Sequence, residues 1–285
     1  MRHFLVSIHI MALLVVLVCP QGASGAPSPY PWYAGSSSAR PLASAVQPPT
    51  GFVRVTVAPG SFADWLRQLP LKPEGSPIRL WDGSIRTDQS GQFAVVDMDV
   101  LRYQECADAW IRLRAEYLWA MHFPDRIAFH LTDGTLSAWS RWANGYRPHV
   151  HDHKITESRT AKPDASRTAF KAFLHHVMTY AGTLSLARDL PRSDLSALAA
   201  GDLLVQGGRP GHAVVILDLA VDAVGRRVML VGQSYMPAQE FHVLKNLSDP
   251  NLSPWYLVDD LAGDGVHTPD WLPFVAQDLR GFAPP

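Results

Sequence analysis

The sequence predicts an α+β domain, and two observations carry this prediction. The first is a helix from about 103 to 121, in which apolar residues recur at three- and four-residue intervals. The second is a series of short apolar segments near the C-terminal end, at 202–206, 212–221, 227–235 and 240–244. Only short connections separate these segments, so we expect an antiparallel β-meander packed on the helix.

The first 25 residues predict a secretory signal peptide. Arg2 is followed by an apolar run from Ile10 to Cys19 and then by small residues up to Ala26. A run of about ten residues is too short to span a bilayer comfortably. We therefore expect residues 1–25 to be removed, and the mature protein to be exported, either periplasmic or extracellular, and not held in a membrane.

Residues 26–50 are rich in proline and serine and show no periodic apolar face, which predicts a disordered tether. A single α+β domain is expected over residues 51–285. Its first elements are a strand at 51–57 and a short helix that begins after Ser61, a favourable N-cap. A hairpin at 78–86 and a strand at 93–100 follow.

The segment between the predicted helix and the meander is long enough to hold insertions. A strand is expected at 127–131, followed by an excursion over 137–160 that carries several histidines. A second helix begins near Asp164 or Ser166, and a shorter helix ends at Asp189. The C-terminal tail shows no periodicity, and we expect it to wrap the core.

Charge and cysteine content narrow the functional classes. The chain has 25 basic and 26 acidic residues, a balance without the basic footprint of a protein that binds nucleic acid or an anionic membrane. Removal of the signal peptide leaves Cys106 as the single cysteine. It is therefore either a free reactive thiol or a small buried apolar residue. Nothing in the sequence implies a cofactor.

Three residues form a possible catalytic constellation. Cys106 falls in the first turn of the predicted helix, His212 begins a strand, and Gln233 ends the next strand. A helix N-terminus favours a thiolate, an imidazole can take the thiol proton, and an amide oxygen can accept the second ring N–H. Ser234 and Gln239 compete with Gln233 for the third position. Without such partners, His212 would be a structural histidine.

The segments GDLLVQGGRPGHAVVILD (201–218) and VMLVGQSYMPAQE (228–240) resemble the core of papain-like bacterial hydrolases of the NlpC and CHAP type. Those enzymes cut peptide bonds in peptidoglycan. The resemblance implies a papain-like fold with insertions, a cysteine hydrolase in which Cys106 is the nucleophile, His212 the base and Gln233 the orienting residue, and cell-wall peptide or amide bonds as the substrate. Peptidoglycan or another envelope peptide or glycan is then the expected partner.

Two features depart from that pattern. Cys106 and His212 are 106 positions apart, and Glu105 stands beside the cysteine, where its charge would raise the pKa of the thiol. From about residue 51 to 282, with its CADAWIRLRAEYL helix and QSYMPAQEFHVLKN strand pair, the chain also resembles an exported bacterial family labelled only as a domain of unknown function.

A histidine cluster offers a different chemistry. His149, His151 and His153 alternate along an extended segment with Asp152, so their imidazoles would project to one side and could hold a transition metal. No glycine-rich turn follows the cluster, which favours an exposed polar loop. We therefore predict no metal site, with these three histidines as the alternative ligands.

The alternative to catalysis is a binding module on a degenerate hydrolase scaffold, because a fold does not by itself determine function. In that case Trp139, Trp142, Trp255 and Tyr256 would form a groove for a glycan or peptide.

Overall fold

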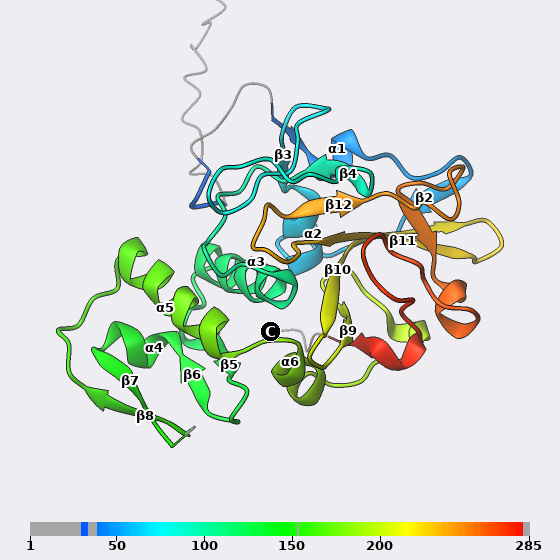
Figure 1. The fold of residues 1–285 in the computed structure, drawn as a ribbon. Coiled ribbons are helices and arrows are strands. Elements are labelled where there is room, and N and C mark those ends of the chain that lie inside the picture. Colours follow the sequence, from blue (N-terminus) through cyan, green and yellow to red (C-terminus); the bar gives the residue numbers. More distant parts are fainter. Residues whose placement is uncertain (1–29, 34–38, 153, 282–285) are drawn as a thin grey trace, which may run out of the picture.

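The computed structural model describes residues 30–33, 39–152 and 154–281, so the expected signal peptide lies outside the described residues. Within these residues the fold is α+β, as predicted, with six α-helices and a main sheet of eight antiparallel strands. Figure 1 shows helix α3 (Cys106–Ala120) between this sheet and a smaller group of helices and hairpins. No helix in the described part of the chain is both long and apolar enough to cross a bilayer.

The other α-helices are α1 (Leu42–Ala45), α2 (Phe62–Arg67), α4 (Trp139–Ala143), α5 (Arg167–Tyr180) and α6 (Thr183–Asp189). The strands are β1 (Arg40–Pro41), β2 (Phe52–Arg54), β3 (Pro70–Leu71), β4 (Gln92–Val95), β5 (Ala128–His130), β6 (Leu136–Ala138), β7 (Tyr146–His151), β8 (Lys154–Arg159), β9 (Leu203–Gln206), β10 (His212–Asp222), β11 (Arg227–Gln233), β12 (His242–Leu244), β13 (Trp255–Leu257) and β14 (Leu279–Arg280). Four short 3-10 helices are Pro124–Arg126, Leu195–Ala197, Asp259–Ala262 and Ala276–Asp278.

The main sheet contains the predicted meander. Its strand order is β14-β9-β10-β11-β12-β4, with β2 paired to β10 and β13 paired to β11. Strands β9 to β12 are therefore neighbours in the order in which they occur in the chain, as expected for an antiparallel meander. The longest strand, β10, has 11 residues and pairs with β9, β11 and β2.

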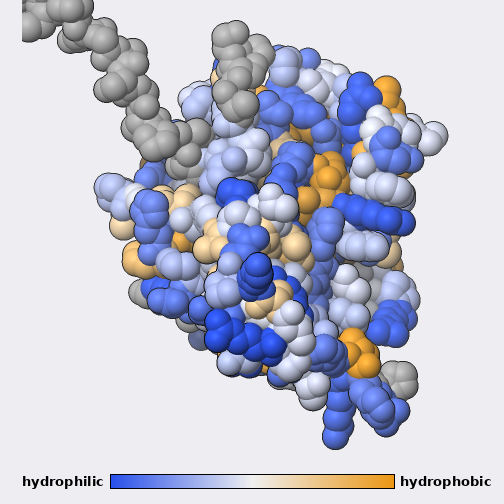
Figure 2. All heavy atoms as spheres, turned by 90° about the vertical axis from the view of Figure 1, so that its left-hand side faces the viewer, coloured by the Kyte–Doolittle hydropathy of each residue, from blue (hydrophilic) through white to orange (hydrophobic). Residues whose placement is uncertain are grey.

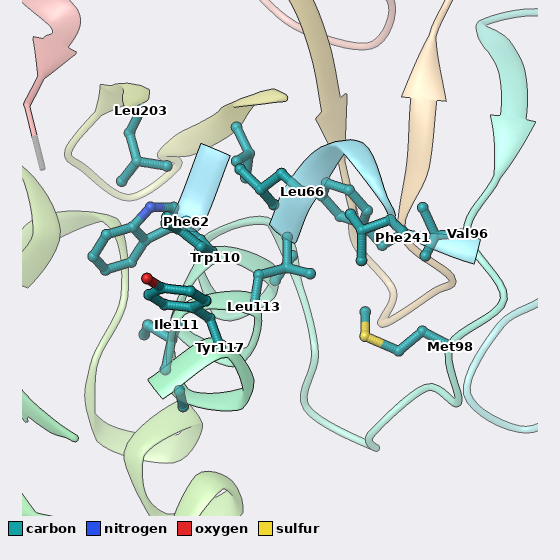
Figure 3. Close-up of a cluster of buried hydrophobic side chains, with 14 of the residues drawn as sticks. Phe62, Leu66, Val96, Met98, Trp110, Ile111, Leu113, Tyr117, Leu203 and Phe241 are labelled. Carbon is teal, nitrogen blue, oxygen red and sulfur yellow. The ribbon is translucent and has the colours of Figure 1, made fainter. Parts of the chain in front are cut away.

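Helix α3 is buried on every side, although its sequence pattern predicts one apolar face. The helix begins with a capping box, in which Glu105 and Asp108 each accept a hydrogen bond from the other's backbone N–H. Figure 3 shows Trp110 and Tyr117 of this helix in one apolar cluster with Phe62 of α2. Polar positions are also covered because α2, α5 and β10 all pack on the helix.

The predicted insertions form a layer against α3. In this layer α5 runs antiparallel to α3, because Arg167 at the start of α5 pairs with Glu116, whereas His175 near its end makes an edge-on ring contact with Tyr103. Ser166, one of the two predicted starting points, caps α5 through its side chain. The side of the molecule formed by this layer is mostly hydrophilic, with apolar residues in small scattered groups (Figure 2).

The prediction of a disordered tether over residues 26–50 needs correction where the structure describes it. Strand β1 pairs with β3, and α1 follows directly. Tyr30, Leu42 and Val46 are buried in the main core. The proline- and serine-rich composition conceals these apolar anchors, which are too widely spaced to give a periodic pattern.

A buried ion-pair cluster holds the N-terminal elements on β10. Asp218 is completely buried on this strand and accepts hydrogen bonds from Arg54 Nε and Arg67 Nε, each over 2.7 Å. Arg54 belongs to β2 and Arg67 to α2, so a single carboxylate joins three elements.

We expect Asp218→Ala to lower the free energy of unfolding by about 3–5 kcal/mol, because it leaves two arginines without their buried counter-charge. Urea unfolding measures this change. Asp189→Ala is the matched control, since the Asp189–Arg188 ion pair is largely exposed and its loss costs less than about 1 kcal/mol. Similar losses for the two variants would contradict a structural role of the buried cluster.

Candidate functional site

The sheet brings His212 and Gln233 together. His212 is the first residue of β10 and Gln233 the last of β11, so both lie at the same end of this strand pair. His212 is completely buried, and its Nε2 lies 2.7 Å from Gln233 Oε1. An amide oxygen only accepts hydrogen bonds, so Nε2 carries the ring proton. His212 Nδ1 has no hydrogen-bond partner in the described part of the chain.

Cys106 reaches the start of the same strand from α3. Its Sγ lies 4.0 Å from the carbonyl oxygen of Gly211, the residue before His212, and only 5% of Cys106 is exposed. Gly211 also packs closely against the start of α6, where a Cβ at this position would lie 2.3 Å from Thr183 Oγ1. The structure therefore places the thiol against the backbone that carries His212.

Burial keeps both groups uncharged. It raises the pKa of Cys106 to about 11, and the charges of Asp108 and Glu105 raise this pKa further. A hydrogen bond from the Ala213 backbone acts in the opposite direction and lowers it. Burial also lowers the pKa of His212 to about 4, although the hydrogen bond to Gln233 partly opposes it. At neutral pH the resting site therefore contains a neutral thiol and a neutral imidazole.

Residues of the C-terminal tail that sequence reasoning missed also surround the histidine. Gln233 Nε2 donates to Asp270 Oδ2 over 3.1 Å, and the ring of Trp271 lies 5.0 Å from the His212 ring between centroids. Both residues belong to the irregular C-terminal tail, which wraps the core as expected. A tail without periodicity does not indicate which of its residues enter the core, so the sequence pattern could not identify them.

The competitors for the third position make no such contact. Ser234 Oγ and both amide atoms of Gln239 are buried without a hydrogen-bond partner among the described residues.

His242, on β12 opposite Gln233, is a second buried histidine. Its Nδ1 lies 3.0 Å from the Glu240 carbonyl oxygen, and burial lowers its pKa to about 4.

The histidine segment forms part of a hairpin. His149 and His151 lie on β7, where His149 Nε2 is 2.6 Å from Ser158 Oγ and His151 Nδ1 is 3.0 Å from Asp152 Oδ2. His153 lies outside the described residues. Among the residues that are described, no three histidine, cysteine or carboxylate side chains are grouped so as to hold a metal ion.

The predicted aromatic groove is wrong. Trp139, Trp255 and Tyr256 are each at most 2% exposed, and Trp142 stacks on His176 with 5.5 Å between ring centroids. Trp139, Trp255 and Tyr256 fill the core and Trp142 packs against it, because burying large rings removes much apolar surface from water.

We expect the alkylation rate of Cys106 by iodoacetamide, in protein lacking residues 1–25, to keep rising with pH up to about 10, because a pKa of about 11 leaves little thiolate at neutral pH. Mass spectrometry of the modified protein gives the rate. Glu105→Gln removes one of the charges that raise this pKa, and should shift the curve to lower pH. A rate that is already constant below about pH 8 would contradict the neutral thiol.

Comparison with known proteins adds one finding to this geometry. The family model described as "Domain of unknown function (4846)" matches residues 42–281. No curated protein and no solved structure matches the chain. The matched region extends from α1 to the residue after β14, so it includes Cys106, His212 and Gln233. The chain therefore belongs to the family called domain of unknown function 4846.

Proposed function

We propose that this protein is a cysteine hydrolase, with a papain-like arrangement of its site, that acts on peptide or amide bonds of the cell wall. Cys106 would be the nucleophile, His212 the base and Gln233 the residue that orients the imidazole. One observation carries the proposal. Gln233 Oε1 holds His212 Nε2 over 2.7 Å, so His212 Nδ1 is the ring nitrogen that has no partner among the described residues. The backbone next to His212, at Gly211, contacts the Cys106 thiol.

The proposed reaction follows from the protonation states of the site. His212 Nδ1 removes the thiol proton as the sulfur attacks the substrate carbonyl carbon, and the backbone N–H of Cys106 helps to stabilise the oxyanion. The C–N bond then breaks, and the imidazolium returns its proton to the leaving amine. Water, activated by the same nitrogen, hydrolyses the thioester and regenerates the thiol. Because both groups start neutral, His212 acts as a general base during attack.

A surface cavity lined in part by the turn that precedes His212 would give the substrate a place to bind. Its volume is about 510 Å³, and Tyr180, Leu184, Gly208 and Arg209 are among its lining residues. Gly208 and Arg209 belong to the turn that leads to the thiol-contacting backbone of Gly211. The cavity combines apolar surface with one cation, Arg209, and one anion, Asp133, which suits a peptide that carries both charged and apolar groups.

A binding module without turnover is the second candidate, and the burial of Cys106 favours it. A thiol that is 5% exposed, with a pKa of about 11, resembles an inert structural cysteine. The aromatic groove no longer contributes to this alternative, so the ligand would bind in the cavity.

Hydrolysis of purified peptidoglycan, followed by mass spectrometry of the released fragments, tests the enzyme. We expect Cys106→Ala and His212→Ala to abolish release. Gln233→Ala should lower the rate about 10²-fold or more, which is the range for losing general acid–base catalysis. Gln239→Ala, which also shortens a buried glutamine, should change it less than about threefold.

Equal effects of the two glutamine variants would exclude Gln233 from the site. Release that persists in Cys106→Ala would exclude the thiol as nucleophile. Binding of peptidoglycan fragments by wild-type protein without any release would favour the binding module.

A further inference from the structure

A chain of polar contacts extends from the candidate base to the protein surface. His212 Nε2 contacts Gln233 Oε1 over 2.7 Å, and Gln233 Nε2 donates to Asp270 Oδ2 over 3.1 Å. The other carboxylate oxygen, Asp270 Oδ1, is ion-paired with Arg86 over 2.6 Å. Each link is short enough to fix the orientation of the next side chain.

The direction of every hydrogen bond in this chain follows from its outer end. A guanidinium only donates, and a carboxylate only accepts. The Gln233 side chain must therefore turn its NH₂ group toward Asp270 and its oxygen toward His212. Since that oxygen only accepts, the ring proton of His212 must lie on Nε2, and Nδ1 keeps the free electron pair.

The tail holds Asp270 firmly in this position. The Asp270 backbone has a φ of 72°, in the left-handed region, and Tyr235 donates its hydroxyl proton to the Asp270 carbonyl over 3.0 Å. Pro269 lies so close to Gly91 that a Cβ there would be 2.4 Å from Pro269 Cβ. Trp271 Nε1 donates to Gln206 Oε1 over 2.9 Å. Such over-determined strain is typical of functional positions.

We propose that Asp270 is a positioning residue that decides which ring nitrogen of His212 carries the proton. It does so without touching the imidazole, by fixing the orientation of the Gln233 amide. An amide presents a donor at one end and an acceptor at the other, so Gln233 alone would leave both tautomers open. The benefit to catalysis rests on the proposed function, because only the Nε2–H tautomer offers Nδ1 as a base.

Asp270→Asn tests this inference. Arg86 only donates, so it will take the asparagine oxygen and leave the asparagine NH₂ facing Gln233. The Gln233 amide then turns over and presents its NH₂ to His212 Nε2, which moves the ring proton to Nδ1. We expect long-range ¹H–¹⁵N correlation spectra of histidine-labelled protein at pH 7 to show Nε2–H in wild type and Nδ1–H in the variant. The His212→Ala spectrum assigns the signals.

Three further variants separate positioning from a loss of folding. Tyr235→Phe removes a hydroxyl bond to the Asp270 backbone but keeps the carboxylate, so Nε2–H should persist. Asp270→Ala frees the amide and should give both tautomers. Gln233→Glu added to Asp270→Asn places a carboxylate, which only accepts, beside His212, so Nε2 should again carry a proton in both the neutral ring and the imidazolium.

Two results would overturn the inference: a proton on Nδ1 in the wild type, or Nε2–H unchanged in both Asp270→Asn and Asp270→Ala. The spectra need no substrate, so their outcome is independent of hydrolysis. A tautomer that switches in a protein without hydrolytic activity would refute the proposed function alone.

Discussion

The pairing of β10 with its neighbours is the constraint on which the rest of the structure depends. From His212 to Ala220 every residue of this strand is buried, because β9, β11 and β2 pair with it and α2 and α3 pack against it. Asp218, in the second half of the strand, binds Arg54 and Arg67 from the N-terminal elements. His212 is the first residue of the same strand. The burial that stabilises the sheet therefore also sets the chemistry of the candidate site.

For the Cys106 thiol, the desolvation caused by burial outweighs the stabilisation of a thiolate by the N-terminus of α3. The N-terminus of α3 stabilises a negative charge by roughly 0.3–1 kcal/mol, and up to about 2 kcal/mol in partly buried sites. A rise in the Cys106 pKa from 9.0 to about 11 corresponds to roughly 3 kcal/mol in the opposite direction. The net result is a protonated thiol, so a nucleophile at this position would be generated as the substrate is attacked.

The sequence could predict the parts of this fold that local pattern determines. Helix α3, the meander and the caps at Ser61 and Ser166 follow from periodicity and side-chain chemistry over a few residues. The meeting of His212 and Gln233 follows from strand order and alternation. These relations need only the connectivity of neighbouring strands.

Contacts between segments far apart in the chain could not be predicted from the sequence pattern. Asp270 reaches Gln233 through a tail without regular structure, and Leu42 enters the core from a segment that reads as a linker. Tryptophan content was equally ambiguous, because a ring such as Trp139 looks the same in a sequence whether it fills a core or lines a groove. Only the three-dimensional packing separates these cases.

The amide at position 233 has a physical advantage over a carboxylate in this setting. Its NH₂ lies 3.1 Å from Asp270 Oδ2, so a carboxylate there would bring two negative charges into contact. A negative charge beside His212 would also favour the imidazolium form, in which Nδ1 cannot act as a base. Glutamine fixes the orientation of the ring and adds no charge of its own, so burial still outweighs the more distant Asp270 charge, which raises the pKa of His212. This keeps the imidazole both oriented and neutral, which is the form that can accept a proton from a neutral thiol.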